Sequence, residues 1–265
     1  MEEGPNALSS LLEVLIGFRM CEVGLVYDMT KAYQSIQTGE IEKHVRRLVW
    51  RWGDVNSSWD ILAYNVVTFG DQIAGLILEL VKRLAAELGM SIDAEACHQI
   101  REKTYVDDGA GGGSRAQVER FRGKCVDCAY DGTIPRILSL VNLKLKVMVA
   151  SGDTDENSLK LLGDKTLGHT WLPPTDKFIF RVNVNLSPKK RGVRSGKDLS
   201  LDDIPRLHTF TFTRRSLLGF VMAQYDPMGL ISPLLVILKI QLRKLYGPDI
   251  NLNWDDPIPI SQRIE

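Results

Sequence analysis

The sequence predicts an α+β fold in which a mixed or antiparallel sheet carries helices on one face and a mainly helical region follows. Strand-like and helical patterns are interleaved throughout residues 20–186. A polar stretch at 187–203, rich in Gly, Ser and basic residues, ends this interleaving, and two apolar helical patterns come after it. The chain has 265 residues, of which 44% are hydrophobic and 25% charged, as in a globular protein with one or two domains.

Helical spacing and strand alternation locate the elements before residue 100. Leucines at helical spacing predict a helix over residues 7–18, and "EVGLVYD" predicts a strand that ends at Asp28. Residues 41–52 fit either a helix or a strand. A further helix is predicted over residues 73–88, with Gly89 as its stop. Four leucines form one stripe along this helix: Leu76, Leu80, Leu84 and Leu88.

The same patterns locate the later elements. "KTYVDDG" predicts a strand that runs into a glycine loop, and "AQVERFRGKCVDCAYDG" predicts a helix that ends at Gly132. "NLKLKVMVAS" alternates as a strand does, and residues 166–186 predict a hairpin around Pro173–Asp176. The C-terminal part predicts two helices interrupted at Asp226–Pro227, because proline disfavours helix at the preceding residue.

Charge and cysteine content limit the classes of function. The 33 basic residues balance 33 acidic ones, so nucleic-acid binding must rely on local patches. Four cysteines are too few for a disulfide scaffold, which favours a reducing, intracellular, cytoplasmic setting. Cys125 and Cys128 form one C-x-x-C without the second pair that a zinc site needs, so we take it as incidental. We find no signal peptide and no run long enough to cross a membrane, and expect a protein that is not secreted.

The stretch "TYVDDGAGGGS" places two adjacent carboxylates behind a β-forming run. Such a pattern fits a surface hairpin turn, and it also fits a metal-dependent site, because adjacent anions need water or a cation. Asp28 likewise ends an apolar strand. If the two strand ends lie side by side, Asp28, Asp107 and Asp108 would gather around one or two Mg²⁺ or Mn²⁺ ions. Hard oxygen ligands of this kind suit the metals of phosphoryl transfer.

Several blocks of the sequence resemble retroelement reverse transcriptases in their order and spacing. "YDMTKAYQSI" looks like the first catalytic motif, "VVTFGDQIAG" the second, and "TYVDDG" the Tyr-x-Asp-Asp motif. "TLGHTWLPPTDKFIF" is similar to a later strand pair of these enzymes. "TRRSLLGFVMAQYDPMGLISP" and "NWDDPIP" resemble the segment after the palm in BEL/Pao-type long-terminal-repeat retrotransposons. The resemblance covers residues of about 20–260.

The resemblance implies an RNA-directed DNA polymerase with two-metal nucleotidyl transfer. It divides the chain into a palm at 1–186, truncated at its N-terminus, a basic polar linker at 187–205, and a helical thumb or connection segment at 206–265. Its catalytic and metal-binding residues would be Asp28, Asp107 and Asp108. Nucleotide binding would fall to Tyr33, Phe69, Gly70 and Lys146, and primer or template binding to Tyr105, Val106, Lys189, Lys190 and Arg191.

Three of these roles compete with simpler ones, and for Tyr105 and Val106 the alternative is a structural role in a β-hairpin. Tyr33, as the aromatic residue that excludes a ribose 2′-hydroxyl, competes with a plain core tyrosine, and Lys146, near the pyrophosphate, competes with a solvated lysine. The implied partners are an RNA or DNA template with its primer and deoxynucleoside triphosphates, and the implied cofactor is Mg²⁺ or Mn²⁺.

The sequence departs from the family at its front end. Only 27 residues precede Asp28, so most of the fingers is missing, and ribonuclease H, protease and integrase parts are not recognised either. Gly75 stands where many relatives have proline, and Asp71 adds an anion near the expected nucleotide site. The alternative is therefore a non-catalytic retroelement remnant, either inert or acting as a nucleic-acid-binding or scaffold protein.

Overall fold

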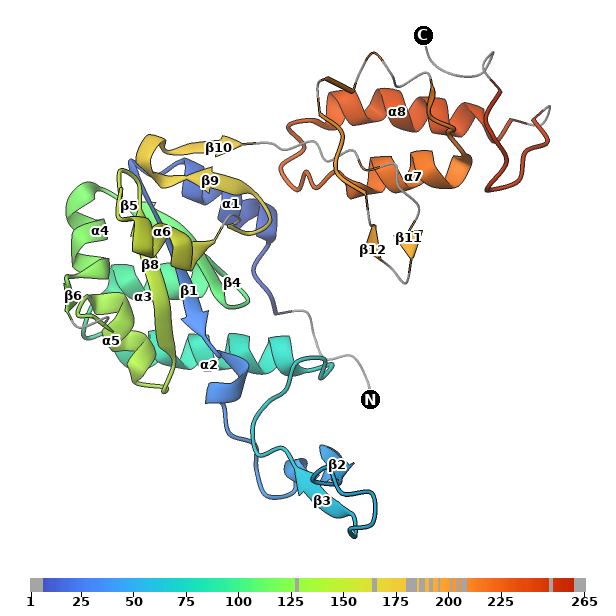
Figure 1. Ribbon diagram of the computed structural model, residues 1–265. Coiled ribbons are helices and arrows are strands. Elements are labelled where there is room, and N and C mark those ends of the chain that lie inside the picture. The colour runs from blue at the N-terminus through green and yellow to red at the C-terminus, as the bar shows by residue number, and fades with distance from the viewer. Residues whose placement is uncertain are drawn as a thin grey trace. The chain divides into compact units, whose positions relative to one another are not determined.

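The computed structural model divides the chain into two compact units, Met1–Ile179 and Phe180–Glu265 (Figure 1). The residues that it describes are 7–126, 129–163, 166–179, 185, 189–190, 193–194, 196–200, 202–203, 205, 209–247 and 250–259. Within these residues, no helix is both long enough and apolar enough to span a membrane.

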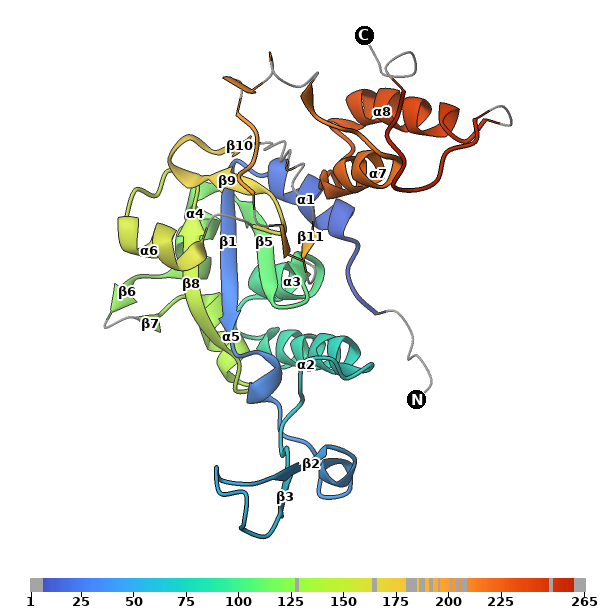
Figure 2. The same cartoon turned by 45° about the vertical axis from the view of Figure 1, so that its right-hand side comes forward.

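A four-stranded antiparallel sheet forms the centre of the first unit, in the order β4-β5-β1-β8 (Figure 2). Its strands are β1 (Val23–Thr30), β4 (Thr104–Tyr105), β5 (Asp108–Gly113) and β8 (Lys144–Ala150). In β1 only Asp28 and Thr30 are not fully buried, so this central strand is covered on both faces until it reaches its C-terminal end. Strand β1 is therefore buried along most of its length, and its partly exposed polar residues lie at its C-terminal end.

One face of the sheet packs on four helices. These are α2 (Ala74–Gly89), α3 (Ala94–Glu102), α4 (Arg115–Arg122) and α5 (Thr133–Ser139). Leu25, Tyr27 and Met29 of β1 share one buried cluster with residues of all four helices, because side chains alternate along a strand. The expected α+β class is confirmed.

The other face of the sheet is covered as well, which differs from the expected arrangement with helices on one face only. Helix α1 (Leu11–Arg19) lies beside the hairpin of β9 (Thr170–Leu172) and β10 (Lys177–Ile179), and the rings of Phe18 and Trp171 meet edge to face with centroids 5.1 Å apart. The Phe18 ring also packs on Gly24, where a Cβ would overlap it. The 3₁₀ turn η3 (Pro173–Thr175) closes the hairpin, and the prediction of a hairpin around Pro173–Asp176 is confirmed.

The segment between β1 and α2 leaves the sheet and returns to it. A 3₁₀ turn, η1 (Tyr33–Ser35), follows β1, and a bridge between Gln37 and Val66 brings the two ends of the excursion together. Between these ends lie η2 (Glu42–Val45), β2 (Arg47–Trp50) and β3 (Asp60–Ala63), with β2 and β3 paired in antiparallel fashion. Residues 41–52 thus contain both of the expected alternatives, a short helical turn and a strand.

The sequence patterns did not predict three of the helices, and they predicted a fourth to be longer than it is. Helix α4 ends at Gly123, whose φ is 67°, and not at the expected Gly132. The two glycines lie against each other, and a Cβ on either one would overlap the backbone at the other. Two short strands follow it, β6 (Cys125–Val126) and β7 (Ala129–Tyr130), and Cys128 lies outside the described residues. Helices α3, α5 and α6 (Glu156–Leu162) are each nine residues or shorter, and such lengths leave little periodic signal.

Helix α2 occupies the expected residues but presents an unexpected face to the core. Leu80, Leu84 and Leu88 of the leucine stripe are about half exposed. The buried face consists of small or apolar residues together with an ion pair, namely Ala74, Leu78, Glu79, Lys82, Ala85, Ala86 and Gly89. The helix is close to the sheet because its packed residues are small; at Gly89, a Cβ would overlap Ile137 of α5.

The second unit contains a pair of short strands and two helices within its described residues. Strands β11 (Lys189–Lys190) and β12 (Val193–Arg194) pair in antiparallel fashion inside the stretch expected to be a linker. Helices α7 (Arg214–Ala223) and α8 (Ser232–Lys244) flank the predicted Asp226–Pro227 break, which is confirmed. Asp226 accepts hydrogen bonds from the amides of Leu230 and Ile231, so the break is a built turn that starts α8.

Candidate active site at the Asp107–Asp108 hairpin

Three carboxylates from two distant segments meet at one end of the sheet. Asp28 on β1 is the register partner of Asp108 on β5, and Tyr105 on β4 is the next partner of Asp108. The backbone amide of Met29 donates to the carbonyl of Asp107 at 3.2 Å. Side chains of register partners lie on the same face of a sheet, so Asp28 and Asp108 point the same way. The expected convergence of two strand ends is thus present in the fold.

The hairpin between β4 and β5 has a two-residue loop, Val106–Asp107. Val106 has φ of 57°, which a β-branched residue rarely adopts. Its side chain is partly buried against the main core, and this packing compensates for the backbone strain. The turn thus begins one residue before the expected Asp-Asp-Gly, and the loop places Asp107 at the tip while Asp108 begins the next strand.

Mutual repulsion and burial perturb the hairpin carboxylates. Burial, together with the charges of Asp107 and Asp28, raises the pKa of Asp108 to about 6. Burial is also the main cause that raises the pKa of Asp107, and the charge of Asp28 adds to it. Lys146 opposes these effects from β8, where its Nζ lies 3.2 Å from Oδ2 of Asp28. Carboxylates with raised pKa values gain the most from a nearby cation.

The donor chemistry of this cluster fits a hard divalent cation. Carboxylate oxygens on adjoining strand ends suit Mg²⁺ or Mn²⁺. Burial first, and then the charges of Asp107 and Asp28, raise the pKa of Asp108, and a bound cation would offset all of these causes. As the side chains lie, no three His, Cys, Asp or Glu residues within the described ranges form a ready ligand cluster. Asp28, Asp107 and Asp108 are the residues that would hold a metal, with Asp28 released from Lys146.

Two aromatic residues predicted for the nucleotide site lie together beside the carboxylates. Tyr33 and Phe69 meet edge to face with ring centroids 5.0 Å apart. Hydrogen bonds between the segments that carry them, from the amide of Val67 to the carbonyl of Ile36, bring the rings into contact. Tyr33 is 8% exposed and Phe69 is 69% exposed, so Tyr33 is the buried member of this aromatic pair and Phe69 the member that faces solvent. Burial, and then the charge of Asp107, raise the pKa of Tyr33.

Gly70 and Asp71 follow Phe69 in a tight turn at the start of α2. Gly70 has φ of 91° and no atom within 4 Å of the position that a Cβ would take, so its backbone is open on that side. Asp71 accepts from Nε of Arg46 at 2.7 Å and from the amide of Thr68. Burial alone would raise the pKa of Asp71, but these hydrogen bonds outweigh it and the pKa is lowered. The anion expected to disturb a nucleotide site is therefore neutralised by Arg46.

The glycines after Asp108 build strand β5 and do not form the expected loop. The Tyr27 ring lies over Gly109, its register partner, and Thr104 on β4 pairs with the same glycine. The Tyr27 hydroxyl is 2.7 Å from Oγ1 of Thr104. Along the same strand, the Gln99 side chain bonds both the amide and the carbonyl of Gly112. Without side chains, the strand lets Tyr27 and Gln99 reach its backbone.

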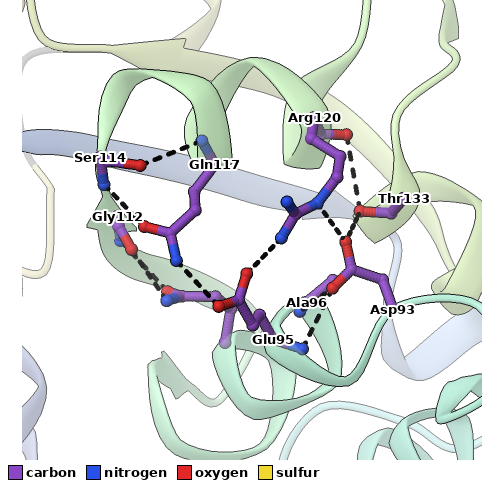
Figure 3. A network of polar contacts seen from close by, with 9 residues as sticks. Asp93, Glu95, Ala96, Gly112, Ser114, Gln117, Arg120 and Thr133 are labelled. Atoms are coloured by element: carbon purple, nitrogen blue, oxygen red, sulfur yellow. Dashed lines mark hydrogen bonds and ion pairs between the residues drawn. The ribbon is translucent and has the colours of Figure 1, made fainter.

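A polar network holds the far end of β5 (Figure 3). Ser114 and Gln117 cap α4 reciprocally, and the Gln117 amide donates to Glu95 at 3.1 Å. Arg120 binds Asp93, which also caps α3 and accepts from Thr133 of α5. Burial by itself would raise the pKa of Asp93, but its hydrogen bonds outweigh this and the pKa is lowered. Three helices are thereby fixed around the strand that begins with Asp108.

Some predicted and some unpredicted residues lie elsewhere. Lys189 and Lys190 belong to β11 in the second unit, and Arg191 lies outside the described residues. Sequence reasoning missed Lys82 and Thr104, which are fully buried behind the hairpin. The available signal for Lys82 was its spacing from Glu79, because residues three apart are neighbours on a helix and these two carry opposite charges.

Comparison with known families finds a similarity in the C-terminal part of the chain. Residues 213–265 match the Pao retrotransposon-like RNaseH-like domain. This match supports a BEL/Pao retroelement. It covers α7, α8 and the residues after them, and no curated protein matches the chain. A Pao retroelement polyprotein domain implies interaction with nucleic acid in general, and RNase H-like domains of retroelements generally use divalent metals. The RNaseH-like description differs from the thumb or connection segment expected for 206–265.

Proposed function

We propose that the first unit is a reverse transcriptase palm, a fragment of a Pao-type retrotransposon polyprotein that performs RNA-directed DNA synthesis by two-metal nucleotidyl transfer. The observation that carries this proposal is the register pairing of Asp28 on β1 with Asp108, the residue that follows the two-residue hairpin loop. Two strand ends thereby supply three carboxylates, and the match to a Pao element at 213–265 gives an independent reason to expect a retroelement polyprotein.

The residues around the hairpin divide the work of the reaction. Divalent cations bound by Asp28, Asp107 and Asp108 would polarise the attacking 3′-oxygen and neutralise the leaving pyrophosphate. Tyr33, backed by Phe69, forms the wall against which the sugar packs, and it excludes a 2′-hydroxyl by volume. Lys146 pairs with Asp28, and with a metal bound by Asp28 it would be free to contact the pyrophosphate. Tyr105 and Val106 support the primer end.

We assign residues 206–265 to a thumb or connection segment that follows a linker at 187–205. Two carboxylates of the Pao-matched segment already have structural partners: Asp226 starts α8, and Asp255 pairs with Arg215 at 2.7 Å. An RNaseH-like nuclease is the second candidate for this segment, on the description of the matching family. Degradation of the RNA strand in an RNA–DNA hybrid by the chain would support that candidate.

Primer extension tests the polymerase proposal. The purified chain is given a primed RNA template, deoxynucleoside triphosphates and Mg²⁺ or Mn²⁺, beside an Asp107→Asn/Asp108→Asn variant. We expect extension by the chain and none by the variant. Asp153→Asn, which removes a carboxylate that pairs with Arg122 away from the hairpin, is the matched control and should still extend. No extension by a folded chain would favour the non-catalytic remnant, and retention of RNA–DNA hybrid on that inactive chain would make it a nucleic-acid-binding protein.

A further inference from the structure

A buried ion pair lies behind the carboxylate hairpin. Lys82 and Glu79 of α2 have side chains that are 0% and 1% exposed, and Nζ lies 2.8 Å from Oε2. Burying two charges costs several kcal/mol of desolvation each, so such a pair is seldom retained for stability alone. The same helix turns three leucines of its stripe toward solvent. The helix therefore gives up apolar burial to bring a charged pair inward, and sites of this kind often serve function.

The ammonium group of Lys82 reaches the base of the hairpin. Its Nζ lies 3.4 Å from the carbonyl of Thr104, the first residue of β4 and three residues before Asp107. Thr104 is itself fully buried, and its hydroxyl meets the Tyr27 hydroxyl on β1. Thr104 is thus held from the helix through its carbonyl and from the central strand through its side chain. These two contacts add to the backbone pairing of β4 with β5 and to the bond from the Met29 amide to the Asp107 carbonyl, which also hold the hairpin.

The charge of Lys82 also acts on the site. Burial lowers the pKa of Lys82, and Glu79 and Asp107 oppose this shift. In turn, the Lys82 charge partly offsets the causes that raise the pKa of Asp107. Interactions through a buried, weakly polar region are stronger than those through water. Lys82 is the fully buried basic side chain among the described residues, and it lies on the core side of the hairpin.

We infer that Lys82 is a positioning residue for the Asp107–Asp108 hairpin: held by Glu79, it binds the Thr104 carbonyl and fixes the loop that presents both carboxylates. The inference rests on the proposed palm function for its meaning, because a fixed hairpin matters most when its carboxylates bind metal. Arg83 offers a matched comparison. It contacts the same Glu79 at 3.2 Å, yet it is 46% exposed and donates to the Ala7 carbonyl and not to Thr104.

Hydrogen exchange in the metal-free chain is the first measurement. Lys82→Met should speed the exchange of amides in residues 104–109 by about tenfold or more relative to the far strand β8, because the hairpin base loses its anchor. Arg83→Met should leave that ratio unchanged. Tyr27→Phe, which removes the other anchor of Thr104 and keeps the ring, should raise the ratio less. If Lys82→Met leaves the ratio as in the wild type, or if Arg83→Met raises it equally, the inference is wrong.

Mn²⁺ binding to the full chain is the second measurement. We expect Lys82→Met to weaken the affinity by about tenfold, in the range seen when outer partners of metal ligands are removed. Arg83→Met should bind as the wild type does. Binding that is absent in the wild type, or that survives Asp107→Asn/Asp108→Asn, would count against the proposed function, while the exchange result would still decide the role of Lys82. If Lys82→Met fails to fold, Lys82→Gln, which is shorter and uncharged and so loses the contact with the Thr104 carbonyl, takes its place in the exchange test: a wild-type ratio in that variant overturns the inference.

Discussion

The ring of Tyr27 lies over Gly109, its register partner across the β1–β5 pair. A Cβ at Gly109 would overlap the ring carbons, so this position accepts no side chain without moving Tyr27. Tyr27 is 1% exposed, and its hydroxyl is bonded to Thr104. The first glycine after the two aspartates is therefore required by the packing of the sheet, because it allows the hairpin to lie close to Tyr27 of β1.

Replacement of Gly109 by alanine should destabilise the chain. Overpacking of a filled core costs about 1–3 kcal/mol, and the displaced ring would also strain its bond to Thr104. Chemical denaturation followed by circular dichroism measures the loss. Gly75→Ala is the control, because Gly75 lies in α2, where an added Cβ would be 3.8 Å from its nearest neighbour, the Leu8 side chain. There alanine should raise the free energy of unfolding by about 0.5–1 kcal/mol. Equal effects at the two glycines would refute the packing role of Gly109.

The raised pKa of Asp108 predicts a particular dependence of stability on pH. In the folded chain the pKa of Asp108 is about 6, above the ordinary value of 3.8. Between these two pH values the native state therefore binds more protons than the unfolded state does. Stability must then fall as pH rises through this window. Asp108→Asn mimics the protonated carboxyl and should stabilise the metal-free chain above about pH 6 by on the order of 1 kcal/mol, with no gain near pH 4.

Urea denaturation of wild type and variant at both pH values measures this difference. Glu156→Gln is the control, since Glu156 is exposed and pairs only weakly with Lys160 at 3.4 Å. Its effect should be small and alike at both pH values. A gain from Asp108→Asn that is as large near pH 4 as near pH 7 would contradict the pKa shift.

Tyr33→Ala should raise the incorporation of ribonucleotides relative to deoxynucleotides. The ring of Tyr33 is packed on Phe69, and in the proposed palm it would fill the space that a 2′-hydroxyl needs. Tyr33→Phe keeps that ring and should keep the selectivity. The ratio of kcat/KM for the two nucleotide types measures the effect in an active chain. Active Tyr33→Ala enzyme with the wild-type ratio would show that Tyr33 is a core residue only.

Arg214 should be the more important of the two arginines that begin α7. Its guanidinium is buried and donates to the carbonyls of Leu245, Leu252 and Ile250. Arg214→Met strands these acceptors, which should destabilise the second unit by about 2–3 kcal/mol. Hydrogen exchange in α7 and α8 measures the local loss in the full chain. Arg215→Met is the control, because it removes an exposed ion pair with Asp255, and exposed pairs contribute little to stability. Similar exchange in both variants would show that the buried contacts contribute little.

The sequence by itself determined the elements that carry the carboxylates. The apolar run that ends at Asp28 predicts the strand that carries this carboxylate, although β1 continues to Thr30. Alternation over Lys144–Ala150 predicts the neighbouring strand β8, which carries Lys146. The break at Asp226–Pro227 was equally predictable, since proline acts on its own neighbour. These features are local, so neighbouring residues suffice to specify them. The spacing of the motifs also pointed to the residues that meet at the hairpin.

Only the tertiary structure decided which face of α2 is buried and what the glycines do. Helical periodicity favours burial of the leucine stripe, whereas close packing against α5 and the sheet selects the small residues and the Glu79–Lys82 pair. The glycines read as a loop until Tyr27 and Gln99, distant in sequence, are seen to occupy the space of their missing side chains. Both outcomes depend on contacts between segments far apart along the chain, and no local pattern encodes such contacts.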